Sequence, residues 1–357
     1  MVTIQHNKSL LDLNTFGLDV KARLFADISN VSDIQELIKL GHLENKRHMI
    51  LGRGANILFS DDYSGLVLKI NIKGIKHTLP DKNSVLLGLG GGEDWGELVK
   101  FAVDQRWGGV ENMAMIPGTV GAAPIQNIAA YGQSLSDVFV SLEAVDLSTG
   151  ELCHFSKDKC EFAYRHSIFR GSLKGKYLIT KVLLKLSRDP IIDTTYHSRY
   201  ESVSTELEKA GEGPYTLEDV YNAVCNIRRN KLPEVGKVGS AGSFFKNPVV
   251  SKKKLFKLQK KVPNVQFYPV DGFSYPQPDD PQLEYANYVK VAAGWLLEEI
   301  GWKGKRVGNV GTWDKHALIV VNYGGATAKE VTSFAKRLKN AFFKAYGIEL
   351  EDEVAII

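Results

Sequence analysis

The chain has 357 residues, 44% of them hydrophobic and 24% charged. This is the composition of a globular protein with two or three cores, and it excludes general disorder. The formal charge of +4 and the isoelectric point near 8.7 are mild, and the basic residues are scattered except for short lysine runs at 252–254 and 260–261. This distribution favours a small anionic ligand over nucleic acid.

The sequence also indicates the cellular compartment of the protein. No stretch approaches the roughly 20 apolar residues of a membrane span, and the N-terminus has no apolar signal core. The three cysteines, Cys153, Cys160 and Cys225, have neither the spacing of a zinc site nor that of a disulfide framework, so we expect no metal. We therefore expect a soluble cytoplasmic monomer with no membrane partner.

Strand and helix patterns alternate with glycine-rich turns in the first part of the chain. Periodicity predicts strands over 22–28, 48–51, 66–70 and 85–89, and helices over 32–43 and 94–105. The loop Gly52-Arg-Gly-Ala-Asn56 follows a strand and precedes an apolar segment, which favours a loop that contacts phosphate. It is not the dinucleotide fingerprint, because the third glycine is missing and no helix pattern follows. A plain turn between elements is the alternative.

The segment between Glu111 and Asp137 contains no charged residue. Its prolines and glycines break any long helix or strand, and its alanines keep side-chain bulk off the backbone. Such a segment can hold an anion such as a pyrophosphate with backbone N–H groups, or it can be a tightly packed connection. The residues alone leave both interpretations open.

Few helices separate the strands that follow, so the sequence predicts an α+β fold and not a doubly wound sheet. A hairpin is predicted over 139–155 and a buried strand over 177–186. The composition shifts near residue 190, which predicts one domain over 1–189 and a second over 190–347, with a C-terminal strand over 348–357 returning to the first. In the second domain, helices are predicted over 216–229, 252–262, 289–300 and 327–345, and a strand over 317–322.

Several short motifs, taken in order, resemble those of one known family. They are Asn14-Thr-Phe-Gly17, Gly52-Arg-Gly-Ala-Asn56, Ile116-Pro-Gly-Thr-Val-Gly121, Pro124-Ile-Gln-Asn127, Tyr164-Arg-His-Ser-Ile-Phe169, Lys231-Leu-Pro233, Gly242-Ser-Phe-Phe-Lys-Asn-Pro248, Ala292-Ala-Gly-Trp295 and Leu350-Glu-Asp-Glu-Val354. The family is that of the UDP-N-acetylenolpyruvoylglucosamine reductases, MurB, and the resemblance runs from about residue 10 to the C-terminus. The aromatic segment around Tyr200 and the long insertion over 263–288 resemble the longer, tyrosine-loop subtype.

The resemblance implies an FAD-binding domain of the vanillyl-alcohol-oxidase type and a C-terminal α+β substrate-binding domain. It implies non-covalent FAD and NADPH as co-substrate, in an enzyme that reduces UDP-N-acetylglucosamine enolpyruvate to UDP-N-acetylmuramate during peptidoglycan synthesis. Hydride arriving at C3 of the enolpyruvyl group leaves negative charge at C2 and its carboxylate, so such a site needs a stabilising cation and a proton donor. The resemblance assigns the proton to Ser243 and the stabilisation to Arg165 and Glu353. From the residues alone, each has a plainer interpretation: a serine in a turn, a solvated or ion-paired arginine, and a carboxylate on the wet face of a strand.

The resemblance also implies two sets of binding residues. Contacts to FAD are expected from Arg53, Gly54, Ala55, Asn56, Pro117, Gly118, Thr119, Gly121, Gln126, Asn127 and Ala129. Contacts to the substrate are expected from Tyr200, Lys231, Lys246, Asn247 and Lys290, with Tyr196 as the alternative tyrosine. The sequence departs from the family pattern at Arg53 and Ala55, where glycine and serine are commonest, and at Gly311-Thr-Trp313, where a Val-His pair is expected.

Two other functions fit parts of the sequence. One is a different flavin oxidoreductase of the same fold, an oxidase or dehydrogenase acting on an alcohol or sugar lactone. Such an enzyme requires a base to remove a proton, whereas the serine, arginine and glutamate set suits protonation of a carbanion. The other is a non-catalytic nucleotide-sugar binding protein. Only the two small-residue loops support this function.

Overall fold

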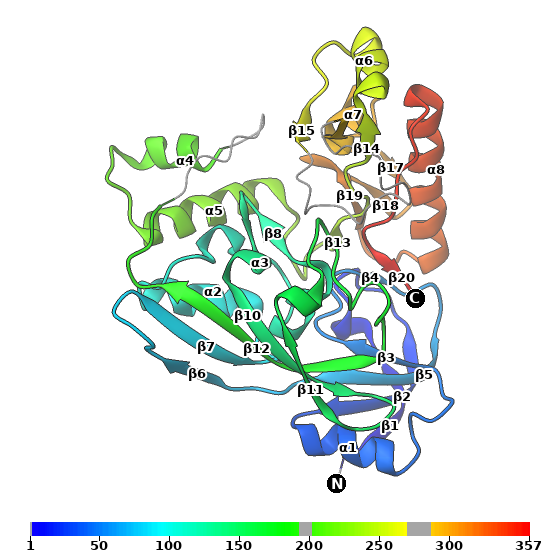
Figure 1. Ribbon diagram of the computed structural model, residues 1–357. Coiled ribbons are helices and arrows are strands. Elements are labelled where there is room, and N and C mark those ends of the chain that lie inside the picture. The colour runs from blue at the N-terminus through cyan, green and yellow to red at the C-terminus, as the bar shows by residue number, and fades with distance from the viewer. Residues whose placement is uncertain (1, 193–201, 270–286) are drawn as a thin grey trace. The chain divides into compact units, whose positions relative to one another are not determined.

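The computed structural model describes residues 2–192, 202–269 and 287–357 (Figure 1). The fold is α+β, as predicted, and the chain divides into two compact units. The first unit comprises Met1–Lys8, Ala22–Arg53 and Ser64–Asn230, and the second comprises Ser9–Lys21, Gly54–Tyr63 and Lys231–Ile357. These units differ from the predicted domains, because residues after 190 belong to the first unit and two N-terminal segments belong to the second. The predicted strand over 348–357 is strand only at β20 (Ala355–Ile356), which pairs in parallel with β4 (Ile57–Leu58).

The first unit contains two sheets. One has the strand order β1-β2-β5-β3, formed by β1 (Ile4–Ser9), β2 (Lys21–Ile28), β5 (Tyr63–Ile70) and β3 (His48–Leu51). The other has the order β11-β10-β12-β7-β6, formed by β11 (Leu152–Ser156), β10 (Phe139–Asp146), β12 (Tyr177–Ser187), β7 (Ser84–Gly90) and β6 (Ile75–Thr78). The predicted hairpin is the antiparallel pair β10 and β11, and the predicted buried strand over 177–186 is β12.

Helices cover both sheets of the first unit through amphipathic faces. Ile34 and Leu37 of α1 (Val31–Lys39) are buried with residues of β2 and β5, and Figure 1 shows α1 beside that sheet. The larger core joins β7, β10 and β12 to apolar residues of α2 (Trp95–Asp104), α4 (Val203–Ala210) and α5 (Leu217–Lys231). Because α4 and α5 contribute to this core, the chain stays with the first unit well beyond residue 190.

The second unit also contains two sheets. One has the order β13-β19-β18-β17, formed by β13 (Gly239–Ser243), β19 (His316–Asn322), β18 (Val310–Trp313) and β17 (Arg306–Val307). The other has the order β14-β16-β15, formed by β14 (Val249–Ser251), β16 (Tyr288–Val291) and β15 (Phe267–Pro269). Three helices pack against these strands: α6 (Lys252–Lys261), α7 (Ala293–Glu299) and α8 (Ala328–Tyr346).

Helix boundaries follow capping chemistry, and two predictions were wrong in this respect. The capping box at the start of α8 is present between Thr327 and Glu330. The helix predicted over 32–43, in contrast, is α1 (Val31–Lys39), whose capping box is formed by Asn30 and Asp33. The predicted helix over 289–300 begins only at Ala293, because Tyr288–Val291 pair with strands on both sides. Apolar residues that suit a helix face equally suit a central strand when backbone partners lie on either side.

Candidate functional site

The uncharged segment forms only short elements, as its prolines and glycines predict. They are η2 (Glu111–Met113), η3 (Val120–Gln126), β8 (Ala129–Ala130), β9 (Gln133–Ser134) and α3 (Leu135–Val138). The start of η3 is hydrogen-bonded to the turn between β7 and α2: Val120 N donates to Glu93 O at 2.9 Å, and Gly121 N donates to Gly91 O at 2.8 Å. A Cβ on Gly91 would lie 2.3 Å from the Ile179 carbonyl oxygen. Glycine is therefore required where the two backbones meet.

We call the region where the start of η3 meets the turn between β7 and α2 the backbone cradle. Residues 118–119 border an opening in it. Thr119 Oγ1 is buried and has no hydrogen-bond partner among the described residues. A Cβ on Gly118 would meet nothing within 4 Å, whereas a Cβ on Gly52 would lie 2.8 Å from Thr119 Oγ1. A buried hydroxyl needs a partner, and exposed amides among small residues suit an anion. These features are compatible with an anion such as the pyrophosphate of FAD, and contact of Gly118 and Thr119 with FAD stays a prediction.

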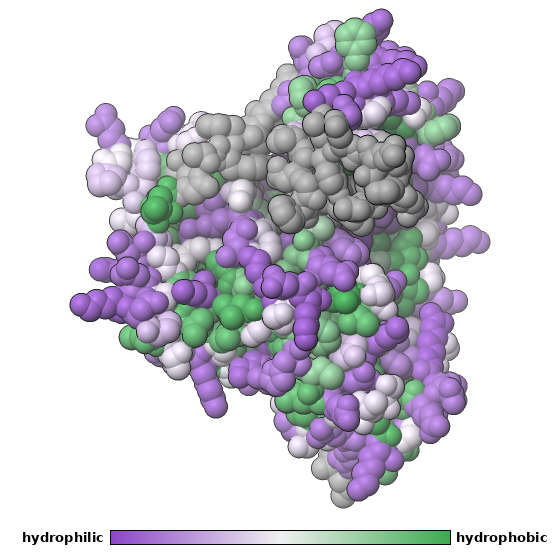
Figure 2. All heavy atoms as spheres, viewed as in Figure 1, coloured by the Kyte–Doolittle hydropathy of each residue, from purple (hydrophilic) through white to green (hydrophobic). Residues whose placement is uncertain are grey.

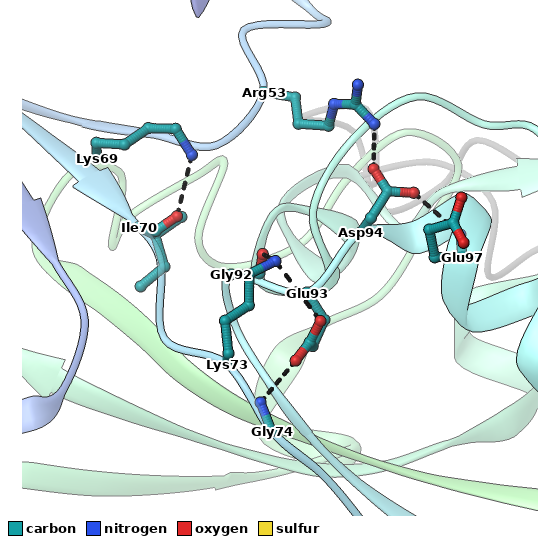
Figure 3. Close-up of polar contacts among 9 residues, drawn as sticks. All are labelled: Arg53, Lys69, Ile70, Lys73, Gly74, Gly92, Glu93, Asp94 and Glu97. Carbon is teal, nitrogen blue, oxygen red and sulfur yellow. Dashed lines mark hydrogen bonds and ion pairs between the residues drawn. The ribbon is translucent and has the colours of Figure 1, made fainter.

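A charged rim lies beside the cradle (Figure 3). Arg53 forms an ion pair with Asp94, and Asp94 also caps α2 by accepting from Glu97 N at 3.0 Å. Asp94 forms an isolated bridge to Thr119. Arg53, one of the departures from the family pattern, thus supports the turn that holds the cradle.

Lys69 belongs to the same charged rim. Its Nζ donates to Ile70 O at 3.2 Å (Figure 3). Burial lowers the pKa of Lys69, and the charges of Lys73 and Arg53 lower it further, whereas Asp27 raises it. Lys73 and Arg53 each form an ion pair with a carboxylate, Glu93 and Asp94, so this edge of the first unit holds charges of both signs.

Arg165 lies at the tip of a tight turn in the first unit. Ala163 and His166 exchange backbone hydrogen bonds of 3.2 and 3.1 Å, and Arg165 has the left-handed φ of 52°. Its Nη1 donates to Ala129 O at 3.5 Å, and Ser167 Oγ fixes the turn to η3 through Ile125 O at 2.8 Å. The turn therefore places the guanidinium against β8 of the uncharged segment.

Two predicted FAD ligands have structural contacts of their own. Gln126 Oε1 accepts from Arg170 Nη1 at 2.9 Å. Asn127 has a left-handed φ of 46°, and its Oδ1 accepts from Ser136 N at 3.0 Å. Both side chains stabilise the shape of the uncharged segment, and their contact with FAD stays a prediction.

In the second unit, the chain brings Ser243 and Glu353 into neighbouring positions. Glu353 N donates to Phe244 O at 2.9 Å, and Phe245 forms a bridge with Asp352. Glu353 is 9% exposed. The register of β13 against β19 shifts between Ser240 and Ser243, and such bulges re-aim a side chain. Gly242 has a φ of 70°, and a Cβ there would enter open space.

Two motifs of the N-terminal region hydrogen-bond to β13, the strand that carries Ser243, and to the segment of Glu353. Thr15 Oγ1 donates to Ser240 O at 2.6 Å, and Thr15 N donates to Gly54 O at 3.1 Å. Asn56 Nδ2 donates to Glu353 O at 3.4 Å. The residues Gly54, Ala55 and Asn56, predicted to contact FAD, thus also belong to the frame that holds Ser243 and Glu353.

The predicted substrate residues differ in their surroundings. Lys246 forms an ion pair with Glu351, and Asn247 Oδ1 accepts from Ala293 N at 3.0 Å at the start of α7. Lys290 lies in β16, the central strand of its sheet. Tyr200 and the alternative Tyr196 lie outside the described residues.

The departure at Gly311-Thr-Trp313 has a structural explanation. Trp313 Nε1 donates to the carbonyl of Lys231 at 3.0 Å, which holds the end of α5. A Cβ on Gly311 would lie 2.7 Å from Lys305 O, so glycine is needed for this strand to pair. These contacts position Lys231, the lysine of the Lys-Leu-Pro motif.

Sequence reasoning missed His316. Its Nδ1 accepts from Leu318 N at 3.2 Å, so the imidazole proton is on Nε2. Burial, with the charges of Lys231 and Lys303, lowers the pKa of His316 to about 3. A Cβ on Gly294 would lie 2.8 Å from the ring, which explains the glycine of the Ala-Ala-Gly-Trp motif. His316 is therefore a neutral Nε2–H donor near Lys231.

Within the described parts of the chain, no group of three His, Cys, Asp or Glu side chains could hold a metal ion. All three cysteines are free. Among the same described ranges, no helix has the length and apolarity needed to cross a membrane. Figure 2 shows hydrophilic residues over much of the face drawn, with apolar residues in separate patches.

Comparisons with known proteins agree with these features. Residues 22–156 match an FAD binding domain, and residues 233–357 match the C-terminal domain of UDP-N-acetylenolpyruvoylglucosamine reductase. The chain is 39% identical over 355 residues to the UDP-N-acetylenolpyruvoylglucosamine reductase of Flavobacterium johnsoniae, covering 99% of both proteins. It is 39% identical over 350 residues to that of Pseudomonas aeruginosa, covering 98% of both. The crystal structure of the Thermus caldophilus enzyme has a TM-score of 0.65 at 21% identity, over 100% of this chain and 98% of that one.

Proposed function

The chain belongs to the MurB family of UDP-N-acetylenolpyruvoylglucosamine reductases, and we propose that it reduces UDP-N-acetylglucosamine enolpyruvate to UDP-N-acetylmuramate in peptidoglycan synthesis. The identity of 39% along 99% of the chain carries this proposal. The placement of Ser243 beside Glu353 in one strand frame supports it, since both belong to motifs that the resemblance assigns to catalysis.

FAD would, when bound, supply the hydride, with NADPH as the source. Side chains of the protein bind the substrate carboxylate, stabilise the developing negative charge and donate the proton to C2. Arg165 offers a guanidinium, the side chain best suited to hold a carboxylate in two hydrogen bonds. Ser243 donates its hydroxyl proton to C2. Glu353 assists as a hydrogen-bond donor, since an ionised carboxylate would repel the negative charge that develops at C2.

Ser243 is a weak acid at neutral pH, so the site has to make its proton transfer favourable. The acceptor is a strongly basic carbanion, and exclusion of water prevents competing protonation. Gly242 leaves open space at its Cβ position, and Glu353 is 9% exposed. These two observations support a site where a ligand covers the serine hydroxyl.

The remaining assignments are part of the same proposal. FAD is bound non-covalently by the predicted residues of both glycine loops, with Thr119 and Gly118 at the pyrophosphate. Lys231, Lys246, Asn247, Lys290 and Tyr200 contact the UDP-sugar, with Tyr196 as the alternative to Tyr200. The enzyme acts as a monomer in the cytoplasm.

The activity is tested by NADPH oxidation in the FAD-loaded protein, with and without UDP-N-acetylglucosamine enolpyruvate. We expect consumption of NADPH that depends on this substrate, with UDP-N-acetylmuramate formed in equal amount. Absence of substrate-dependent consumption contradicts the proposal. Oxidation supported by an alcohol or sugar lactone identifies a different flavin oxidoreductase, and a protein that binds UDP-sugars but takes up no FAD identifies a non-catalytic binding protein.

The serine role is tested by Ser243→Ala, with Ser240→Ala on the same strand as control. Loss of one group that stabilises or protonates the transition state commonly lowers a rate about a hundredfold or more. We expect Ser243→Ala to leave flavin reduction by NADPH unchanged and to slow reoxidation by substrate by about that factor. Ser240→Ala is expected to retain both rates. Equal slowing of both half-reactions by Ser243→Ala indicates a structural serine.

A further inference from the structure

The lysine runs at 252–254 and 260–261 belong to one helix, α6, which the proposed mechanism does not use. Six of its ten residues are lysines and none is acidic. Ser251 caps the helix by accepting from Lys254 N at 3.2 Å. Leu255 and Leu258 are buried, and α6 packs against β14 and β16 of the second unit. One face of α6 is therefore fixed to the second unit.

Two of the lysines fasten α6 to the end of α8. Lys254 Nζ donates to Gly347 O at 2.8 Å, and Lys261 Nζ donates to Ala345 O at 3.4 Å. Cations at the C-terminal end of a helix are favourable because its last carbonyl groups carry partial negative charge. These two lysines thus have a structural role, which the other lysines of α6 do not share.

The opposite side of α6 combines exposed lysines with an exposed aromatic ring. With 3.6 residues per turn, positions 253, 256, 257 and 260 lie side by side along a helix. We call these residues, Lys253, Phe256, Lys257 and Lys260, the outer face of α6. Phe256 is 63% exposed, and Lys260 Nζ lies 5.0 Å from the centroid of its ring. Figure 2 shows hydrophilic residues gathered over α6, with a smaller apolar area among them.

This outer face is unfavourable for the protein by itself. Among the described residues, no carboxylate forms an ion pair with a lysine of α6. Lys253 and Lys257 lie one turn apart, and like charges at this spacing destabilise a helix. The lysines at 252–254 occupy the first turn, where the helix dipole disfavours cations. Phe256 adds apolar contact with water. A surface that is both anionic and apolar would reduce all of these costs.

The combination of groups indicates the chemistry of that surface. Clusters of about four to eight basic residues on an amphipathic helix are typical of binding to anionic lipid headgroups. An aromatic ring suits the boundary between headgroups and acyl chains, and long lysine side chains reach headgroup phosphates beside it. Nucleic-acid recognition relies heavily on arginine, and α6 contains none. An anionic bilayer surface is therefore favoured over nucleic acid.

We propose that the outer face of α6 is a peripheral docking site for a membrane surface that contains anionic phospholipids. The lysines contact headgroup phosphates, and the ring of Phe256 enters the boundary with the acyl chains. The inference goes beyond the proposed function, because it uses none of the residues assigned to FAD or to the substrate. It differs from the sequence-based expectation of no membrane partner, which rested on the absence of a spanning segment and of a signal core.

The test is flotation of the FAD-loaded protein with vesicles made of equal parts of phosphatidylglycerol and phosphatidylcholine. One triple variant removes three charges from the outer face, through Lys253→Gln, Lys257→Gln and Lys260→Gln. A control triple variant removes three exposed lysines from separate places in the chain, through Lys39→Gln, Lys174→Gln and Lys329→Gln. Both variants have the same net charge, so a difference between them reports on position. All six side chains are exposed, and circular dichroism checks that each variant folds.

Each lysine beside an anionic surface strengthens binding by about fivefold. We therefore expect the outer-face variant to bind the anionic vesicles about a hundredfold more weakly than the wild type, and the control variant to bind nearly as well as the wild type. Added salt should weaken binding of the wild type, and vesicles of phosphatidylcholine alone should bind neither protein. Equal losses in the two variants, or equal binding of the wild type to both kinds of vesicle, overturn the proposal.

A single substitution tests the aromatic contact. Burial of the Phe256 ring in the bilayer predicts about tenfold weaker binding for Phe256→Ala, at high and low salt alike. Leu40→Ala is the matched control, because Leu40 is 61% exposed and lies at the end of α1 in the first unit; it is expected to bind as the wild type does. Wild-type binding by Phe256→Ala contradicts insertion of the ring.

The same proteins are also tested with a single-stranded RNA oligonucleotide. We expect the wild type to prefer the anionic vesicles. Binding of the RNA through the outer-face lysines, without binding of the vesicles, identifies a nucleic acid as the partner and overturns the proposal. Because flotation requires no turnover, failure of the proposed reductase activity and failure of this inference are distinguishable.

Discussion

The substitution His316→Asn isolates one buried titrating group in the second unit. Asparagine Oδ1 can take the place of Nδ1 as acceptor for the Leu318 N–H, which the imidazole accepts at 3.2 Å, but it binds no proton. In the wild type, burial and the charges of Lys231 and Lys303 lower the pKa of His316 from 6.5 to about 3. As the pH falls below 6.5, the unfolded chain binds a proton at this position that the folded chain does not.

The sign and size of the effect follow from this difference in proton binding. A lowered folded-state pKa means that the associated stability is present above pH 6.5 and is lost as the pH falls toward 3. Each pH unit within this window lowers the free energy of unfolding by about 1.36 kcal/mol. Lowering the pH from 7 to 5 should therefore reduce the stability of the wild type by about 2 kcal/mol through this group alone. His316→Asn lacks this contribution.

The assay is urea unfolding of the FAD-loaded wild type and His316→Asn at pH 7 and pH 5, followed by circular dichroism. The quantity of interest is the difference between the two pH-induced changes in unfolding free energy. Other titrating groups, including Lys231 and Lys303, are present in both proteins and cancel. A difference near zero, or a wild type that loses less stability than the variant, refutes the interpretation of His316 as a buried neutral imidazole.

Two further pairs of substitutions test the frame of the site. A Cβ on Gly239 would lie 2.1 Å from the Phe16 carbonyl oxygen, whereas a Cβ on Gly242 would meet nothing. Gly239→Ala should therefore cost about 3 kcal/mol of stability from overpacking, and Gly242→Ala about 1 kcal/mol from its positive φ, in thermal or urea unfolding; equal losses would contradict the predicted clash. Asp94→Ala removes the N-cap of α2 and should cost about 1 kcal/mol, whereas Arg53→Ala removes a half-exposed partner and should cost less than that. A larger loss for Arg53→Ala would show that the ion pair, and not the cap, stabilises this turn.

The sequence predicted local structure well where one interaction decides it. The Thr327 and Glu330 pair begins α8 as expected, and the alternating pattern over 139–155 forms the predicted hairpin. The helix predicted over 289–300 was wrong in its first part, because pairing with β14 and β15 determines the conformation of Tyr288–Val291. Strand partners distant in sequence cannot be identified from the periodicity of one segment.

Some residues of the candidate site were predicted from the sequence and others were missed, for a similar reason. Ser243, Arg165 and Glu353 were identified by resemblance to family motifs, and their chemical roles remain a proposal. His316 and Arg228 were missed because their residue types are unremarkable in the sequence. Their significance comes from burial and from the groups around them, including the close approach at Gly294 and the Met115 carbonyl, which accepts from Arg228 Nη2 at 3.3 Å.

The sequence by itself determined the α+β character of the chain, most helix ends and the presence of small-residue loops, since these depend on composition, capping groups and local periodicity. The tertiary structure alone decided how Thr15 and Asn56 support the strand of Ser243 and Glu353. It also decided that the imidazole of His316 is neutral and that the Nε of Arg228 has no acceptor among the described residues. The physical reason is that proton affinity and hydrogen-bond satisfaction depend on neighbours in space, which residues far apart along the chain supply.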